Sequence, residues 1–242
     1  MTTVILAWIL CAQGAAKTED KAADEALEKF KAEYKSKEAS ARATAVSELA
    51  KTAHDKVFAR LGQVLDSQED KEVRIAAAKG LGSAGENKKK PVQILIGSTL
   101  PNARDPFVLA AILEALGKLG DQMACSTVEN HFKSKSATVL KAAVEAAGEL
   151  KSRGSVHPLI QLLKNLEEGA KEAPALGNNN NNNNNAGLGN NGMTDDMARE
   201  RERVVKPLVV KVLAALTKAN FSLAKEWEEW WRSEGQKFMS GK

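Results

Sequence analysis

The sequence predicts an all-α fold in which pairs of antiparallel helices stack into an α-solenoid. Three observations lead to this prediction: a composition rich in helix formers, a ten-residue block that recurs at near-constant spacing, and an amphipathic segment after each block. Aromatic residues make up 5% of the 242 residues, beside 43% hydrophobic and 27% charged residues. Ala, Leu, Lys and Glu favour helices, whereas the aromatic residues that favour strands are scarce.

The recurring block occurs four times without gaps. VRIAAAKGLG begins at Val73, VLAAILEALG at Val108 and VLKAAVEAAG at Val139, while ARATAVSELA at Ala41 ends in Ala instead of Gly. The four starts are 32, 35 and 31 residues apart, a period typical of helical repeat proteins. Within each block the apolar side chains recur three and four positions apart, so each block predicts one helix with a buried face.

Residues at both ends of the block fit helix termini. Asp70, Asp105 and Ser136 lie three residues before the first Val, where their side chains can cap free backbone amides. Gly at the tenth position, as at Gly82 and Gly117, predicts a left-handed residue that ends the helix.

A second helix is predicted after each block. Amphipathic segments cover residues 55–68, 91–100 and 155–166, and Pro91 suits a first helical turn. The segment at 122–132 is the least regular of the set. One pair of helices cannot bury its apolar face alone, so the pairs must stack to form a continuous core.

The first sixteen residues predict a signal peptide. They carry no charged side chain, and the apolar run at 4–12 is too short to span a bilayer but has the length of a signal-peptide core. Small residues follow at 14–16, where a signal peptidase could cut. Cleavage would leave an exported, periplasmic or extracellular chain with no integral membrane span. The run has no Lys or Arg before it, so an uncleaved apolar arm on a cytoplasmic protein remains the alternative.

The rest of the chain divides by composition. Residues 17–38 predict an N-terminal capping helix, and residues 39–173 hold the four repeats. Residues 174–192 include eight consecutive asparagines and predict a disordered linker, because this segment has almost nothing to bury. Residues 193–242 predict a degenerate fifth repeat and a Trp-rich terminal cap.

Three tryptophans lie on one face of the last predicted helix. Trp227, Trp230 and Trp231 are spaced i, i+3 and i+4, so they form a single stripe that would seal the open end of the last repeat. The alternative is an exposed aromatic platform that binds a partner.

Two parts of the sequence resemble a known family. The pattern Asp-x-x-Val-Arg-x-x-Ala-Ala that begins at Asp70 resembles the first helix of a HEAT repeat. The sequence ALTKANFSLAKEWEEWW at 215–231 resembles the closing segment of bacterial exported HEAT-repeat proteins, except that Lys218 stands where those have Gly. The resemblance implies a right-handed, armadillo-like solenoid. It also implies that the first helices make the convex wall and the second helices the concave wall.

Catalytic and cofactor motifs are not predicted. The glycines at 80, 82 and 85 have dinucleotide-binding spacing, but an amphipathic helix precedes them where that fingerprint requires a strand. His54, His131 and His157 have no partners at metal-ligand spacing, so no metal or cofactor is expected. The lysines at 88–90 predict a solvated turn, with a phosphate or acidic-partner contact as the alternative.

The sequence therefore predicts a non-catalytic module for protein–protein interaction or scaffolding. Partner-binding candidates are the polar residues opposite the apolar stripes of the second helices: Lys56, Arg60, Gln63, Lys90, Gln93, Gln161 and Lys164. Because several are basic, we expect a slight preference for an acidic partner surface. Enzymes with HEAT-like folds, DNA glycosylases and bilin lyases, are the alternative. The net charge of only +4 argues against nucleic acid as the partner.

Overall fold

The computed structural model describes the backbone of residues 2–172 and 191–241, and the side chains of residues 18–169 and 198–241. Every regular element in these residues is a helix, which confirms the all-α prediction. The predicted linker lies almost wholly outside the described residues, and so do the side chains of the predicted signal peptide.

The chain divides into two compact units. Unit 1 is Met1–Ala124 and unit 2 is Cys125–Lys242. Helices that contain the recurring block are called first-row helices, and the helices that follow them are called second-row helices.

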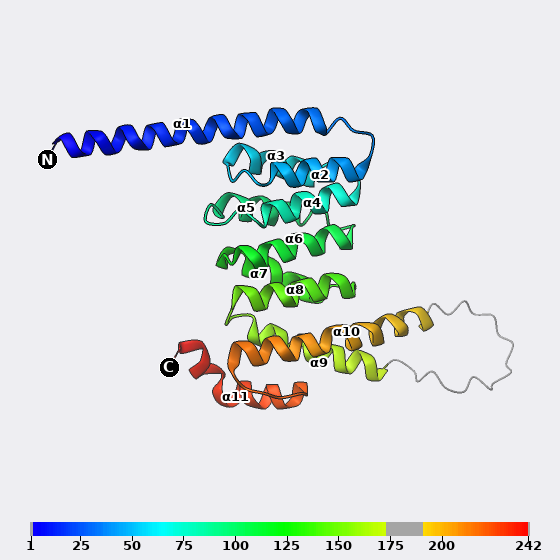
Figure 1. Cartoon of the computed structure of the whole chain (residues 1–242). Helices are drawn as coiled ribbons and strands as arrows, with labels where there is room; N and C mark the ends of the chain where they lie inside the picture. Colours follow the sequence, from blue (N-terminus) through cyan, green and yellow to red (C-terminus); the bar gives the residue numbers. More distant parts are fainter. Residues whose placement is uncertain (1, 173–190, 242) are drawn as a thin grey trace. The chain divides into compact units, whose positions relative to one another are not determined.

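Unit 1 stacks two rows of helices against a long N-terminal helix (Figure 1). In chain order its elements are α1 (Thr2–Glu33), α2 (Ala39–Leu49), α3 (Asp55–Leu65), α4 (Lys71–Leu81), α5 (Lys89–Ser98), α6 (Pro106–Leu119) and the 3₁₀ turn η1 (Gln122–Ala124). The first-row helices α2, α4 and α6 pack in succession, the second-row helices α3 and α5 pack on each other, and α1 packs on α2 and α3.

Unit 2 continues the pattern after an irregular start. Its elements are α7 (Cys125–Asn130), the 3₁₀ turn η2 (His131–Lys133), α8 (Ala137–Leu150), α9 (Val156–Glu172), α10 (Asn191–Thr217) and α11 (Ala224–Ser240). The first-row helix α8 packs on α10, and the second-row helix α9 packs on α10 and α11. The least regular segment of the sequence is therefore the one that breaks into η1, α7 and η2.

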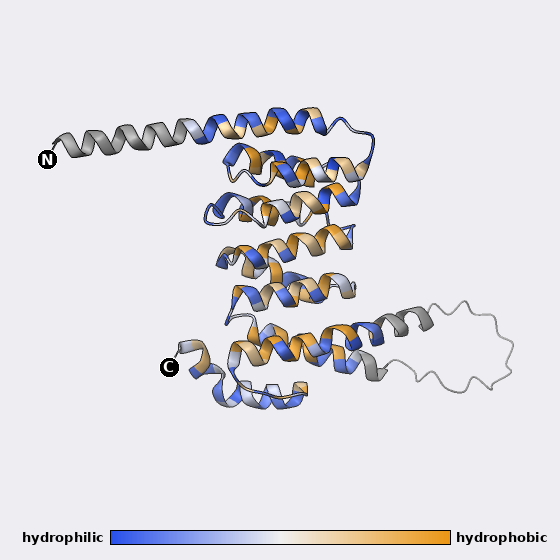
Figure 2. Cartoon of the chain, in the orientation of Figure 1, coloured by the Kyte–Doolittle hydropathy of each residue, from blue (hydrophilic) through white to orange (hydrophobic). Residues whose placement is uncertain are grey.

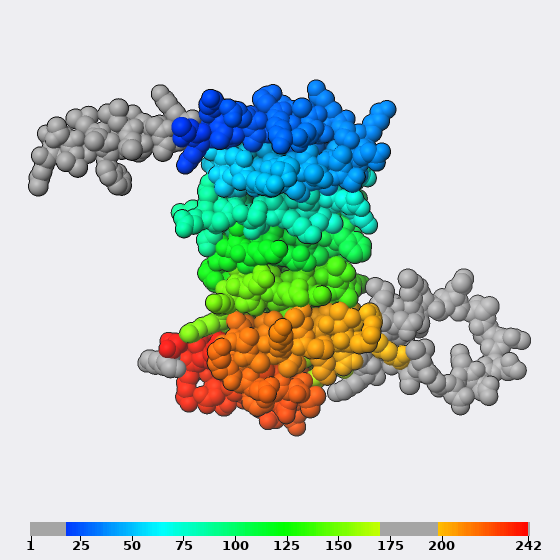
Figure 3. Space-filling view, viewed as in Figure 1, coloured from blue at the N-terminus to red at the C-terminus, as the bar shows by residue number. Residues whose placement is uncertain are grey.

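Each recurring block forms a first-row helix, as its periodicity predicts. α6 is the most apolar of them, with Val108, Ile112, Leu113 and Leu116 fully buried, and it is orange along most of its length in Figure 2. In the space-filling view the helices of unit 1 lie against one another without open gaps (Figure 3). The many alanines of the block allow this close approach, because a small side chain lets the neighbouring helix come near.

The prediction of a left-handed glycine at the tenth position of the block is wrong. Gly82 has a right-handed φ of −67°, and α6 continues past Gly117 to Leu119 before it ends at Gly120, with φ 63°. Gly82 serves close packing instead: a Cβ placed there would lie 2.8 Å from the Cβ of Ala115. The position needs a small residue because α4 and α6 touch at this point.

The predicted N-caps divide into two kinds. The carboxylate of Asp105 accepts hydrogen bonds from the amides of Phe107 and Val108, at 3.1 and 3.3 Å, and Ser136 caps α8 in a similar way. Asp70 occupies the N-cap position of α4 but makes no capping hydrogen bond. Its carboxylate instead lies 2.8 Å from the guanidinium of Arg42.

Two arginines at equivalent positions of α2 and α4 form hydrogen bonds and ion pairs with the loop before the next first-row helix. Arg42 donates to Glu69 at 3.0 Å as well as to Asp70, both in the loop that precedes α4. Arg74 donates to Asn102 and lies 3.7 Å from Asp105, in the loop that precedes α6. The two guanidinium groups are largely shielded from solvent, although Asp70 is exposed, and their bonds to the following loop help to fix the spacing of successive repeats.

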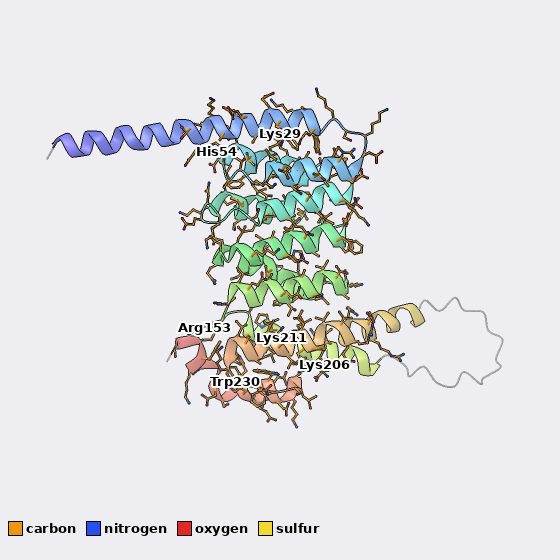
Figure 4. All side chains as sticks on the ribbon, in the orientation of Figure 1. Lys29, His54, Arg153, Lys206, Lys211 and Trp230 are labelled. Atoms are coloured by element: carbon orange, nitrogen blue, oxygen red, sulfur yellow. The ribbon has the colours of Figure 1, made fainter. Side chains whose placement is uncertain are left out.

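The three last helices of unit 2 meet at one half-buried carboxylate. Glu167 of α9 lies 3.1 Å from the amine of Lys206 on α10, which Figure 4 labels. The same carboxylate accepts from the backbone amide of Ala224, at the start of α11. An acid at a helix start is favourable because the free amides there carry partial positive charge.

Candidate functional site

Five of the seven candidate residues lie on two neighbouring second-row helices of unit 1. Lys56, Arg60 and Gln63 belong to α3, and Lys90 and Gln93 belong to α5. Lys56, Gln63 and Gln93 are exposed, whereas Arg60 and Lys90 are half-buried.

The core beneath these two helices is tightly packed. Val57, Phe58 and Leu61 of α3 are fully buried. A Cβ at Gly62 would lie 2.7 Å from the side chain of Ile94 on α5. The outer faces of α3 and α5 are thus held at a fixed separation.

The cation of Lys56 is already paired within unit 1. Its amine lies 2.8 Å from Asp24 and 3.1 Å from Asp20, both on α1. Hydrogen bonds to Asp24 and then to Asp20 raise the pKa of Lys56 above its ordinary value. His54, labelled in Figure 4, caps α3 and also reaches Asp20, at 3.5 Å. The acidic side of α1 therefore covers the first turn of α3.

Arg60 is engaged by aromatic rings of the same helix α1 and its following turn. Its guanidinium lies 5.3 Å from the ring centre of Phe30 and 5.8 Å from that of Tyr34, and it donates to Gln63 at 3.0 Å. Burial, with a hydrogen bond to Glu69, raises the pKa of Tyr34 well above its ordinary value. Arg60 thus helps to hold α1 on α3.

The basic run at 88–90 has three different environments. The amine of Lys88 donates to the carbonyl of Leu119, at the negative end of α6, over 3.2 Å. Lys90 lies 3.4 Å from the carboxylate of Asp55. Lys89 is exposed. Two of the three lysines therefore have structural contacts, and only Lys89 fits the solvated turn that the sequence predicts.

The remaining candidates, Gln161 and Lys164, lie one turn apart on α9 in unit 2. Gln161 is half-buried, and the amine of Lys164 lies 3.0 Å from Glu228 of α11. The hydrogen bond to Glu228 raises the pKa of Lys164. All four candidate cations thus have a contact inside the chain. The sequence pattern did not reveal these contacts, because each acid or ring comes from a helix or turn other than the one that carries the cation.

The tryptophan stripe packs mainly inward. Trp227 is fully buried, and its indole N–H donates to the carbonyl of Phe221 at 3.1 Å. Trp231 stacks on His157 with ring centres 5.4 Å apart. The half-buried Trp230, which Figure 4 labels, makes an edge-on contact with Phe238. This geometry supports the sealing interpretation.

One hollow in unit 2 has a lining that sequence reasoning missed. It has a volume of about 240 Å³, and its walls come from η2, α8, α9 and α10. Leu140, Leu162 and Leu166 contribute apolar surface, and Lys133 and Arg201 contribute cations. No local pattern could have shown this site, because its lining residues are spread over about 70 positions of the chain.

Two other kinds of feature, a metal site and a membrane-spanning helix, do not occur in the described part of the chain. No group of three or more His, Cys, Asp or Glu side chains is placed there to hold a metal ion. Among the same residues, no helix has both the length and the apolar character needed to cross a bilayer.

Comparison with known proteins identifies the repeat. A family model described as HEAT repeats matches residues 27–100 and again residues 96–173. The two matches together cover residues 27–173, which is 147 of the 242 residues. No curated protein matches the chain.

Proposed function

The chain belongs to the HEAT-repeat family, and from this membership we propose that it is a non-catalytic module that binds another protein through its second-row helices. HEAT repeats are in general protein-interaction and scaffold modules. The proposed surface in unit 1 is the outer face of α3 and α5, and in unit 2 it is the corresponding face of α9.

The rigid presentation of polar side chains by α3 and α5 carries this proposal. The exposed Gln63 and Gln93 project from helices whose opposite faces are fully buried, and the Gly62–Ile94 contact fixes the distance between them. A preformed surface loses little conformational freedom when it binds, which favours affinity.

The preference for an acidic partner rests on few groups. Lys56 and Lys90 already face the carboxylates of Asp24 and Asp55, so a partner's acids must compete with them. The exposed Lys89, beside the amide of Gln93, is the best-placed cation for a new contact. The preference is therefore slight, and the amides contribute most of the polar recognition.

Export from the cytoplasm is part of the proposal. The ion pairs that join α1 to α3 involve Asp20 and Asp24, so cleavage between Ala15 and Lys17 would leave these pairs in place. N-terminal sequencing of the natively expressed protein should find a start between residues 15 and 17. A chain that still begins at Met1 or Thr2 would contradict export by this route.

Site-specific photo-crosslinking tests the binding face. A photoreactive phenylalanine at Gln63 or Gln93 should capture a discrete protein in the native compartment, to be identified by mass spectrometry. The same group at Lys79 or Lys118, exposed on the first-row helices α4 and α6, is the matched control. Equal capture from both rows, or capture only from the first row, would contradict the proposed face.

The non-catalytic part of the proposal has its own test. Retention of the purified chain on double-stranded DNA that falls steeply with salt would instead favour the glycosylase alternative. Transfer of a bilin pigment to an acceptor protein would favour the lyase alternative. We expect neither activity.

A further inference from the structure

The loop between α5 and α6 presents apolar side chains to solvent. Leu100 is 82% exposed, the largest exposed fraction of any large apolar side chain in the described part of the chain, and Phe107 in the first turn of α6 is 54% exposed. Pro101 and Ala103, which lie between them in the sequence, are exposed as well. Because Leu100 buries less than a fifth of its surface, packing within unit 1 does not account for an apolar residue at this position.

This loop is longer and less polar than its equivalent in the preceding repeat. The loop from α5 to α6 covers residues 99–105, with the sequence TLPNARD, whereas the loop from α3 to α4 covers residues 66–70, with the sequence DSQED. The two added residues and their apolar neighbours have no counterpart between α3 and α4. In repeat proteins such insertions map to loops on one face of the stack, which is often the face that binds a partner.

The loop is held in place by the hydrogen bonds of a buried asparagine. The side-chain amide of Asn102, which is 1% exposed, donates to the carbonyl of Ser98 at 2.8 Å and to the carboxylate of Asp66 at 3.0 Å. The backbone amide of Ala103 donates to the carbonyl of Leu100 at 3.2 Å. Leu100 therefore projects from a fixed backbone, and a partner that buries it does not have to order the loop first.

Two cations accompany the apolar side chains. The amine of Lys71 lies 5.1 Å from the ring centre of Phe107. Arg104 is exposed, and it makes no hydrogen bond or ion pair with any residue in the described part of the chain. The only acid of the loop, Asp105, is half-buried and caps α6. A carboxylate that approaches the loop would therefore meet an unpaired cation in Arg104.

We propose that this loop docks on a partner protein by inserting Leu100 into an apolar recess, with Arg104 beside a carboxylate at the rim of that recess. The inference rests on the protein-binding part of the proposed function, and it extends the binding surface from the second-row helices to the loop that follows α5. An anionic lipid surface fits less well, because the exposed carboxylates of Asp66 and Asp70 in the neighbouring loop would be repelled by it.

Photo-crosslinking from within the loop supplies the partner for the test. A photoreactive phenylalanine replaces Ala103, so that Leu100 and Arg104 stay intact, and the full chain is expressed in its native compartment. The protein that this chain captures, and that the same chain with Leu100→Gln does not capture, is identified by mass spectrometry and purified. Its affinity for the chain without the photoreactive group is then measured by isothermal titration calorimetry.

Three variants give the decisive comparison. Leu100→Gln should weaken binding about tenfold or more, as expected when one large apolar side chain loses its burial. Arg104→Glu should weaken it by roughly three- to tenfold, and more so at low salt, because a charge at the rim acts at long range. Met123→Gln is the matched control and should leave the affinity unchanged, since Met123 is 55% exposed in the same unit but lies in η1, outside this loop.

Each contrary outcome has a distinct meaning. No Leu100-dependent capture from Ala103, or a captured protein that binds Leu100→Gln as tightly as the wild type, would overturn the docking loop. Capture from Gln63 or Gln93 in that case would leave the proposed function standing, whereas capture from Ala103 alone would contradict the second-row face and keep the docking loop. Leu100-dependent binding to vesicles of equal parts phosphatidylcholine and phosphatidylserine, without a captured protein, would show a lipid-binding loop and overturn the assignment to a protein.

Discussion

Lys218 adopts a left-handed backbone conformation, with φ 66°, just after α10 ends. Its amide donates to the carbonyl of Ala214 at 2.9 Å, as in the helix endings that favour glycine. The sequence resemblance leads to the expectation of Gly at this position, and Lys218 has the left-handed backbone conformation that glycine favours.

Lys218→Gly should stabilise unit 2. The left-handed conformation costs a residue with a Cβ about 1–2 kcal/mol, and the freedom of glycine in the unfolded chain offsets about 0.4–1 kcal/mol of that gain. We expect a net increase of about 0.5–1 kcal/mol in the free energy of unfolding. Urea denaturation measures it.

Lys211→Gly is the matched control, since Lys211 is exposed within α10 (Figure 4). The same substitution there should destabilise by roughly 0.5–1 kcal/mol. Equal effects of the two substitutions would contradict the left-handed assignment at Lys218.

His131 gives unit 2 a pH dependence. Burial lowers the pKa of its imidazole below the ordinary value of 6.5. The folded state therefore holds His131 neutral, and in the window just below pH 6.5 the unfolded state binds more protons. Stability should fall as the pH drops from 6.5 toward the lowered pKa of the folded state.

Urea denaturation at pH 7.5 and at pH 5.5 measures this effect. The wild type should lose more stability between the two values than His131→Gln, which has no imidazole to protonate. An unchanged pH dependence in the variant would mean that His131 is readily protonated in the folded chain.

At the scale of helices, two glycines should respond in opposite ways to the same change. Gly82→Ala brings a Cβ to 2.8 Å from the Cβ and 2.9 Å from the Cα of Ala115, so α4 and α6 must move apart. We expect a loss of about 1–3 kcal/mol, typical of an overpacked contact. Gly169→Ala enters open space within α9 and should stabilise by up to about 1 kcal/mol.

Thermal or urea unfolding of the two alanine variants measures whether their stabilities change in opposite directions. Gly82 has an ordinary right-handed φ, so conformational strain cannot explain a loss there. If both variants were stabilised, the close approach of α4 and α6 would not limit the size of residue 82.

Among the three tryptophans of the stripe, Trp227 should contribute most to the stability with which the terminal helix α11 packs on unit 2. Trp227 is fully buried, whereas Trp230 is half-buried, so Trp227→Ala should cost about 3–5 kcal/mol and Trp230→Ala less. Hydrogen exchange should become faster around Val205 and Leu213 of α10, with α4 little changed, because repeats couple mainly to their neighbours. A stable Trp230→Ala variant that loses a partner would instead support the binding-platform interpretation.

For the whole chain, the asparagine tract should matter little to stability. α9 and α10 pack on each other, so the segment between Glu172 and Asn191 joins helices that are already held together. Deleting residues 178–185 should change the free energy of unfolding by less than about 1 kcal/mol, because loop-closure entropy varies slowly with length. A loss of several kcal/mol in calorimetry would show that the tract packs on unit 2.

The helices and their repeat follow from local residue patterns alone. Apolar positions three and four apart fix which face of a helix is buried, and this local property is independent of what the helix packs against. Val73, Leu81, Val108 and Leu116 therefore became core residues as predicted. The Asp105 and Ser136 caps were equally predictable, because capping depends on only a few neighbouring residues.

The charge and shape of the surfaces depend on contacts between helices that are distant in sequence. Lys56 and Lys164 have basic side chains on the predicted faces, yet Asp24 and Glu228 reach them from other helices. Gly82 fits the pattern of a helix terminus, but its size is set by Ala115 of a helix more than thirty residues away. The hollow in unit 2 is likewise lined by residues of four elements, η2, α8, α9 and α10. Periodicity reports which way a side chain points, whereas its partners depend on how helices distant in sequence come together.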